Sequence, residues 1–284
     1  MTFSWGTVCG ARPAVMGVVN VTPDSFSDGG RWLEPEAAVA HGMELAAAGA
    51  DVLDVGGEST RPGAEAVAAD EERRRVVPVI ERLVAEAGVP VSVDTTKRDV
   101  AAAALDAGAA IVNDVSAARF QPGILGLVAT AGAGYVAMHM QGEPRTMQHD
   151  PRYDDVVRDV VAFLGNRLDA ARSAGIAEGA LAVDPGIGFG KTVRHNLELL
   201  ARLPEIVSAA GVPVLVGTSR KRFIGAVLDR RGADLPADQR EEGTLATVVW
   251  AIDRGARLVR VHEARPAAQA VQLLEKIRTV KAVA

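Results

Sequence analysis

The chain has 284 residues, a length that suits one α/β barrel or two small domains. Hydrophobic residues make up 48% of it and aromatic residues only 4%, so we expect a sizeable core filled mainly by Ala, Val and Leu. The formal net charge of −5 argues against the broad basic surface that nucleic-acid binding requires, although a phosphate group can still bind at a local cationic site.

Export and membrane insertion are not expected. Cys9 is the single cysteine, so no disulfide can form within the chain, and the favoured interpretation is a small buried residue near the terminus. Residues 1–13 lack a basic segment followed by a long apolar run, and no apolar run approaches membrane-spanning length. We therefore expect a cytoplasmic protein in which residues 1–13 form a short N-terminal cap.

Short apolar runs alternate with helix-like segments along the chain. The predicted strands are residues 14–20, 51–57, 89–94, 110–114, 134–139, 181–184, 212–218 and 258–262. Each run ends in or is closely followed by an acid, an amide or a base. Eight such strands separated by helices predict a (β/α)8 TIM barrel whose active site lies at the carboxyl ends of the strands.

Helical periodicity supports the same architecture. Helices are predicted at residues 34–48, 70–87, 122–132, 154–174, 192–203, 241–254 and 266–281, with a further alanine-rich helix ending at Gly108. Pro78 lies inside an apolar stripe that continues past it, which favours a kink over a break. An open doubly wound sheet is the main alternative, but it more often has a glycine-rich phosphate loop after its first strand. No linker divides the chain, so residues 1–284 are expected to form a single domain.

The polar residues at the strand ends are the strongest functional signal. Asp94, Asn113 and Asp184 follow apolar runs, so they should be partly buried at the barrel mouth, where carboxylates need hydrogen-bond donors. A fused pyrimidine ring with an amino group and ring N–H groups would supply those donors, and Lys221 could donate to acceptors of the same ring. Internal ion pairing, for example between Asp184 and Lys221, is the alternative; it suits one pair better than four residues meeting from four strands.

Two loops could cover a ligand. Residues 20–30, NVTPDSFSDGG, combine turn-forming residues with the aromatic Phe26, so they could form a lid or an ordinary connection. Residues 56–64, GGESTRPGA, contain Thr60 and Arg61. The Arg61 guanidinium suits a carboxylate or phosphate, although this segment taken alone favours a surface arginine.

The later strand ends add glycines and cations. Residues 184–192, DPGIGFGKT, would allow close backbone approach to a flat ligand, but their spacing is not that of a Walker phosphate loop. Arg260 and His262 alternate along their strand, so both side chains should face one side and, with Arg61, could bind a pyrophosphate. His139 has no companion with metal-site spacing, which favours a core or supporting role.

Taken together, the motifs carry a family resemblance from the first strand to the last helix. The segments, in chain order, are NVTPDSFSDGG, DVGGESTRPGA, SVDTTK, NDVSA, MHMQGEPRTMQ, DPGIGFGKT, GTSRKRFIG and RVHEARP. The chain resembles the dihydropteroate synthase family, whose fold is a (β/α)8 barrel, in agreement with the independent strand count. One departure is Glu263, where the family leads us to expect Asp.

The resemblance implies roles for individual residues and active-site loops at about residues 21–31 and 57–68. The residues implied to bind the pterin diphosphate are Asp94, Asn113, Asp184 and Lys221 at the ring and Thr60, Arg61, Arg260, Val261 and His262 at the pyrophosphate side. The residues implied to surround p-aminobenzoate, where sulfonamides would bind, are Pro62, Phe189, Ser219 and Arg220. Asn20 would help to hold Mg²⁺, and Asp94, Lys221 and Arg61 would be catalytic.

The implied reaction joins (7,8-dihydropterin-6-yl)methyl diphosphate to p-aminobenzoate in folate biosynthesis, by a Mg²⁺-assisted, SN1-like route that releases pyrophosphate. The resemblance also implies a homodimer. Two alternatives stay open: the pterin-binding barrel of a cobalamin-dependent methyltransferase, and a paralogue that binds pterin without catalysis. The intact Ser219-Arg220-Lys221 segment and the lack of a cobalamin module argue against the first, and the intact motifs argue against the second.

Overall fold

Eight parallel strands form one sheet in the order β6-β5-β4-β3-β2-β1-β8-β7 in the computed structural model, which describes residues 2–22, 34–59, 66–229 and 235–281. The strands are β1 Ala14–Asn20, β2 Val52–Gly56, β3 Val91–Asp94, β4 Ile111–Asp114, β5 Gly134–Met138, β6 Leu181–Asp184, β7 Leu215–Val216 and β8 Leu258–Val261. A parallel bridge between Val183 and Val214 joins the two edges and closes the cylinder. The predicted (β/α)8 barrel is confirmed.

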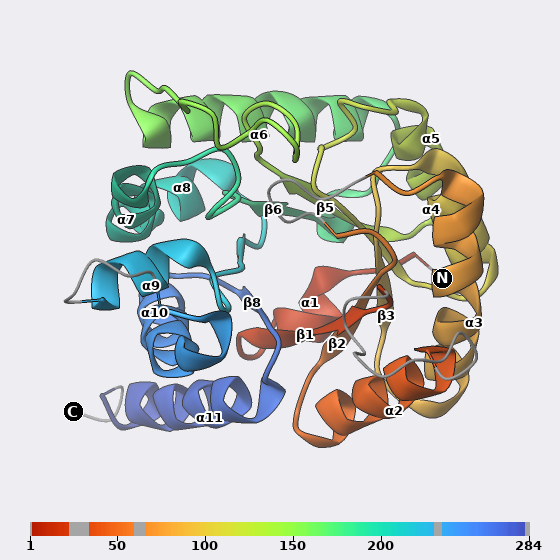
Figure 1. Ribbon diagram of the computed structural model, residues 1–284, viewed down its shortest axis with the longest axis horizontal. Helices are drawn as coiled ribbons and strands as arrows, with labels where there is room; N and C mark the ends of the chain where they lie inside the picture. The colour runs from red at the N-terminus through yellow and green to blue at the C-terminus, as the bar shows by residue number, and fades with distance from the viewer. Residues whose placement is uncertain (1, 23–33, 60–65, 230–234, 282–284) are drawn as a thin grey trace.

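Helices surround the strands (Figure 1). Their bounds are α1 Trp5–Cys9, α2 Glu34–Ala47, α3 Ala69–Glu86, α4 Arg98–Asp106, α5 Gly123–Ala131, α6 Val156–Ser173, α7 Val193–Ala201, α8 Leu203–Ala210, α9 Arg222–Leu228, α10 Glu241–Asp253 and α11 Ala264–Lys281, with short 3-10 turns at Glu178–Ala180 and Ala237–Gln239. Helix α3 continues through Pro78, so a break at this proline is excluded. Among the described helices, none is long and apolar enough to cross a membrane.

Two elements differ most from the sequence prediction, and proline contributes to both differences. Strand β7 has two residues instead of the seven expected, because Pro213 has no N–H to donate and the chain turns away after Gly217. The predicted helix at 192–203 is correct only to Ala201. The chain changes direction at Arg202, and a second helix, α8, begins with Pro204 in its first turn.

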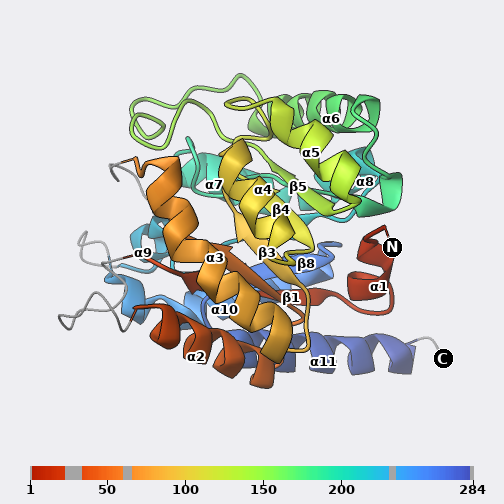
Figure 2. The ribbon, with the colours of Figure 1, turned by 90° about the vertical axis from the view of Figure 1, so that its right-hand side faces the viewer.

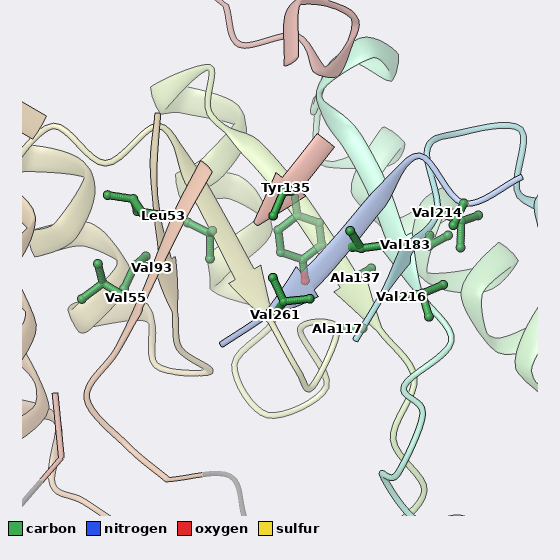
Figure 3. Packing of buried hydrophobic residues seen from close by; sticks show 14 of the residues in the cluster. Leu53, Val55, Val93, Ala117, Tyr135, Ala137, Val183, Val214, Val216 and Val261 are labelled. Carbon is green, nitrogen blue, oxygen red and sulfur yellow. The ribbon is translucent and has the colours of Figure 1, made fainter. Parts of the chain in front are cut away.

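Side chains along each strand alternate between the barrel interior and the layer between strands and helices. In β2, Leu53 and Val55 belong to the large outer cluster (Figure 3). Val52 belongs to the inner cluster. Asp54 lies between the two outward residues, so its side chain points into the barrel. The same alternation turns Asp94, Asn113, Asp184 and Arg260 inward, and this is how the strands position the functional site.

Helix α1 closes the amino end of the barrel (Figure 2). Trp5 is 1% exposed and its Nε1 donates to the Ala180 carbonyl at 2.9 Å. With Cys9, it packs on the inward side chains Ala14, Met16, Val52, Ile111, Val136, Ala182, Leu215 and Leu258. The expected N-terminal cap is therefore an apolar plug, and Cys9 is buried as predicted.

Replacing Trp5 with Ala should lower the free energy of unfolding by about 3–5 kcal/mol, because it empties a buried site that cannot fully collapse. Urea denaturation followed by circular dichroism measures this loss. Trp250 on α10, which is 41% exposed, supplies the matched control, and its change to Ala should cost clearly less. Equal losses for the two variants would contradict the role of α1 as a plug.

Candidate active site

A pocket opens at the carboxyl ends of the strands. Its lining residues are Val18, Asp94, Asn113, Val115, Met138, Asp184, Phe189, Gly217, Ser219, Lys221, Arg260 and His262. The four residues expected to meet a single flat ring, Asp94, Asn113, Asp184 and Lys221, all line it, although they come from β3, β4, β6 and the turn after β7. The structure therefore brings together the set on which the functional interpretation depends.

Both carboxylates of this set are held in a poorly solvated environment. Burial raises the pKa of Asp184, while the charge of Lys221 and a 2.6 Å hydrogen bond from the Gly186 N–H to Oδ1 oppose the rise. Burial raises the pKa of Asp94 to about 7, an effect that Arg260 opposes and Asp54 reinforces. A ligand that donates N–H groups to these carboxylates would favour their ionised forms and relieve the cost of burial.

Arg260 extends from β8 across the barrel interior. Its Nε donates to Asp54 Oδ2 at 2.6 Å, and its Nη2 donates to Asp94 Oδ2 at 2.8 Å. Burial opposes the charge of the guanidinium, yet the two carboxylates outweigh it and the pKa of Arg260 is raised. We expected Arg260 to form a cationic cluster with Arg61 and His262. Its charge is instead engaged by two carboxylates, although Arg260 and His262 both line the pocket.

Asp54 is a site residue that the sequence analysis did not assign. Its side chain is fully buried, and Oδ2 also accepts a 2.9 Å hydrogen bond from Asn113 Nδ2. The Asn113 amide nitrogen is thereby committed to Asp54, and its oxygen is the atom that can accept a hydrogen bond from a ligand. The signal was present in the sequence, since Asp54 alternates with Leu53 and Val55 in an apolar run and must face the opposite side of the strand.

Lys221 is held by the loop that follows β6. Its ammonium donates to the Ile187 carbonyl and lies 4.5 Å from the centroid of the Phe189 ring. Burial lowers the pKa of Lys221 to about 8, and the charge of Asp184 opposes this. Within the described part of the chain, the hydrogen-bond acceptor of the ammonium is thus a backbone carbonyl and not the Asp184 carboxylate, which disfavours a simple internal ion pair.

Close backbone contacts shape the β6–α7 loop. Gly186 has φ +66°, and a Cβ there would lie 1.8 Å from the His139 carbonyl oxygen, so only glycine fits. Behind the loop, the buried Lys191 Nζ lies 2.9 Å from His139 Nδ1 and donates to the carbonyls of Gly186 and Phe189 at 2.9 and 3.0 Å. Burial, reinforced by Lys191, lowers the pKa of His139 to about 2, which fits the supporting role expected for this histidine.

The ends of β7 and β8 are tied together at the pocket. Ser219 Oγ lies 2.9 Å from His262 Nδ1 and accepts a hydrogen bond from the His262 N–H at 3.2 Å. The Arg220 side chain extends from the same turn to Glu263, with a 2.7 Å contact. Glu263, the departure from the family pattern, therefore keeps a carboxylate partner for Arg220.

The remaining expected site residues do not line the pocket or lie outside the described residues. Val261 is 1% exposed, and its side chain belongs to the outer cluster facing the helices (Figure 3), so only its main chain can reach a ligand. Asn20 ends β1 in register with Gly56, which in turn pairs with Asp94. Thr60, Arg61 and Pro62 lie outside the described residues, as do residues 23–31 and 60–65 of the two expected loops.

Comparisons with known proteins agree with this geometry. The family model described as "Pterin binding enzyme" matches residues 16–262. The dihydropteroate synthase of Mycobacterium leprae is 49% identical over 92% of each chain. The chain belongs to the dihydropteroate synthase family. The corresponding enzyme of Bacillus subtilis is 46% identical over 93% of this chain and 88% of its own.

Solved structures of the family share the whole barrel. A Xanthomonas albilineans dihydropteroate synthase with 4-aminobenzoic acid is 52% identical, with a TM-score of 0.87, and the match covers 94% of this chain and 93% of the other. A Yersinia pestis dihydropteroate synthase in a sulfonamide drug complex is 43% identical, also with a TM-score of 0.87, over 95% of both chains. Membership of the dihydropteroate synthase family places the chain among pterin-binding transferases that have this barrel fold.

Replacing Asp54 with Asn should lower the pKa of Asp94 from about 7, because the charge of Asp54 raises it and Arg260 would then face one carboxylate instead of two. Carbon-13 NMR titration of labelled aspartate measures this change. Asp51→Asn is the control, since Asp51 pairs with Arg12 just before β2, at the amino end of the barrel. An unchanged Asp94 titration in the Asp54 variant would contradict the network.

The same variant has a predictable effect on stability. The folded state raises the pKa of Asp94 above its ordinary 3.8, so it binds this proton more tightly than the unfolded chain does. Stability is therefore lost as the pH rises from about 4 through about 7. In the Asp54→Asn variant, the pKa of Asp94 should lie closer to 3.8, so the free energy of unfolding should fall by less and over a narrower pH range. Denaturant titrations across the pH range would show this.

Proposed function

We propose that this pocket joins (7,8-dihydropterin-6-yl)methyl diphosphate to p-aminobenzoate, with release of pyrophosphate and formation of 7,8-dihydropteroate. The observation that carries the proposal is the convergence of Asp94, Asn113, Asp184 and Lys221 on one cavity. The match to curated dihydropteroate synthases over nearly the whole chain supports it. A related Xanthomonas albilineans structure, 49% identical with a TM-score of 0.84, holds 7,8-dihydropteroate, the proposed product.

The pterin ring would meet three acceptors and one cation. The carboxylates of Asp94 and Asp184 and the amide oxygen of Asn113 can accept from the ring amino and N–H groups, while Lys221 donates to ring acceptors. A ring without these donors would leave the two buried carboxylates with only their bonds from Arg260 and the Gly186 N–H, at a cost of about 1–3 kcal/mol or more for each lost ligand bond. The pocket therefore selects a donor-rich pyrimidine edge.

The proposed p-aminobenzoate subsite lies beside Lys221. Phe189 and Ser219 line the pocket there, and Arg220 follows Ser219 in the same turn. Pro62, the fourth residue that we assign to this subsite, lies outside the described residues. A sulfonamide drug is bound in the related Yersinia pestis structure, so we propose the same subsite as the sulfonamide target here.

The residues at the barrel mouth suit a magnesium ion. Among the described residues, no cluster of three or more His, Cys, Asp or Glu side chains forms a metal cage. Mg²⁺ instead often keeps its waters and binds through few protein oxygens together with substrate phosphates. The Asn20 amide oxygen, at the end of β1 and two strands from Asp94, is the protein ligand that we propose. The ion would neutralise charge on the leaving pyrophosphate.

The protein's own groups favour a dissociative displacement. As the C–O bond breaks, negative charge grows on the pyrophosphate, and His262 at the mouth, with Thr60 and Arg61, is proposed to bind it. Positive character on the methylene group is delocalised into the pterin ring, next to the Asp94 and Asp184 carboxylates. The neutral arylamine then attacks from the subsite formed by Phe189 and Ser219, and the proton that its nitrogen loses passes to the released pyrophosphate or to solvent. In this scheme Asp94, Lys221 and Arg61 are the catalytic residues, and no protein nucleophile is required.

Domain organisation, assembly and location are proposed on the same basis. One barrel domain spans residues 1–284. We propose a homodimer, supported by exposed apolar side chains on α11 such as Leu273 and Ile277, which are 63% and 47% exposed. A cytoplasmic location is proposed from the use of a single, unpaired cysteine, Cys9.

A pterin-binding methyltransferase is the second candidate function, but the curated relatives described above are dihydropteroate synthases.

The direct test is turnover. Incubating the protein with the pterin diphosphate, p-aminobenzoate and Mg²⁺ should produce dihydropteroate and pyrophosphate, both measured by chromatography. Asp184→Ala should lose pterin affinity by about tenfold or more in calorimetry, since buried ring donors lose a charged partner. Asp169→Ala, on the exposed face of α6, is the control and should bind normally. Pterin binding without product in the wild-type protein would favour a non-catalytic paralogue.

The pH dependence of kcat/KM for the pterin substrate should be bell-shaped. Asp94, with a pKa of about 7, must be ionised to accept from the ring, so activity rises as the pH approaches about 7. Lys221, with a pKa of about 8, must be protonated to donate, so activity falls as the pH rises through about 8. Lys221→Arg should remove the alkaline limb, whatever its absolute rate. A wild-type profile that is flat from about pH 6 to about pH 9 would contradict both assignments.

A further inference from the structure

The turn that carries Ser219, Arg220 and Lys221 has a strained residue at its centre. The Lys221 N–H donates to the Thr218 carbonyl at 3.1 Å, which closes a four-residue turn. Arg220 occupies the third position of this turn with φ +59°. That conformation normally requires glycine or asparagine, because a Cβ crowds the backbone there. A larger side chain persists in such a conformation only where the surrounding structure holds it.

A polar stripe at the start of α10 lies against this turn. Arg240, Thr244 and Thr247 follow the i, i+4, i+7 spacing of one helical face. The Arg220 N–H donates to Thr244 Oγ1 at 3.0 Å, and the Arg220 carbonyl accepts from Arg240 Nη1 at 2.8 Å. Thr247 Oγ1 donates at 2.8 Å to Oγ1 of Thr218, the first residue of the turn. Both backbone polar groups of the strained residue are therefore bonded to the same helix face.

The stripe is buried and internally braced. Arg240 is 8% exposed and Thr244 is 1% exposed, so their polar atoms face the turn and not bulk water. Thr244 Oγ1 also donates to the Arg240 carbonyl at 2.9 Å, and Arg240 Nε donates to the Leu235 carbonyl at 2.6 Å. Neither residue lines the pocket. Among the described residues, both bond to the turn, and this is the route by which they would influence a bound ligand.

We propose that Arg240 and Thr244 are positioning residues that keep Arg220 in its left-handed conformation and thereby set the places of Ser219 and Lys221 in the pocket. The catalytic meaning of this inference rests on the proposed function. Were Arg220 to relax to negative φ, the chain would leave the turn toward α9 in another direction. The Ser219 contact with His262 and the Lys221 bond to Ile187 could not both persist.

The identity of Arg220 shows why such a device is needed. Glycine would adopt this backbone conformation without strain, but it would lack the guanidinium that reaches Glu263 at 2.7 Å. Keeping a side chain at this position requires that the surrounding structure offset the backbone strain. The two hydrogen bonds from Thr244 and Arg240 offset this backbone strain. They also link α10 to the pocket, although no residue of α10 lines it.

Two variants and a rescue test the proposal. Thr244→Val removes the acceptor with little change in shape, and Arg240→Met removes the donor. Each should lower kcat/KM for p-aminobenzoate at least tenfold, mainly through KM, while pterin affinity falls less because Asp94, Asn113 and Asp184 lie on other strands. Thr244→Ser keeps the hydroxyl and should restore near-normal kinetics. Arg257→Met is the matched control, because Arg257 donates to the Gly10 carbonyl near the amino end of the barrel.

A crystal structure of Thr244→Val supplies a readout that does not need activity. Arg220 should leave the positive-φ region, and the Ser219–His262 contact should lengthen. If the wild-type protein makes no dihydropteroate, the proposed function fails, yet this structure still decides the positioning role. Folded Thr244→Val and Arg240→Met variants that retain wild-type kcat/KM and a positive φ at Arg220 would overturn it. Should Arg240→Met not fold, Thr244→Val alone carries the test.

Discussion

The pocket depends on one buried network, in which the Arg260 guanidinium bridges the carboxylates of Asp54 and Asp94. Charged side chains inside a barrel are tolerated only when hydrogen-bond or ionic partners satisfy them. Each hydrogen bond of this network also fixes the orientation of the side chains that it joins. Asp54 holds the fork of Arg260 and the amide of Asn113 with the same oxygen atom. Removing Asp54 would therefore disturb two pocket residues at once, although Asp54 itself does not line the pocket.

The barrel separates stability from function along its axis. At the amino end, α1 and the inward residues of several strands, Ile111 and Leu258 among them, form an apolar plug around Trp5. Toward the carboxyl end, the inward positions become Asp54, Asn113 and Arg260. An apolar floor shields the ion network from water on one side, which strengthens its hydrogen bonds and shifts the pKa of Asp94 toward neutrality. The apolar plug around Trp5 therefore contributes to the pKa shift of Asp94 as well as to the stability of the barrel.

The count of strands and the alternation of side chains along them predicted the barrel and the convergence of its polar residues. Both could be predicted because the alternation along a buried strand depends only on the local sequence. The same logic, applied fully, would have assigned Asp54 an inward position and turned Val261 outward. What a sequence cannot show is how a charge is shared. The bonding of Arg260 to two carboxylates, which the expected cationic cluster did not include, depends on distances between β2, β3 and β8. The positive φ of Arg220 leaves no compositional trace either, since arginine does not mark left-handed turns.

Lys221 is the point where these separate constraints meet. Its ammonium is fixed by the Ile187 carbonyl, whose loop can approach only because Gly186 and Gly188 lack side chains; a Cβ on Gly188 would lie 2.9 Å from Lys221 Cδ. Its backbone is fixed by the strained turn that the start of α10 holds. Burial lowers the pKa of this amine to about 8 and the charge of Asp184 opposes the shift, so the amine retains its proton at neutral pH. The position of the ammonium that we propose for contact with the pterin ring is therefore set jointly by β6, by the glycine loop after it and by a helix that does not line the pocket.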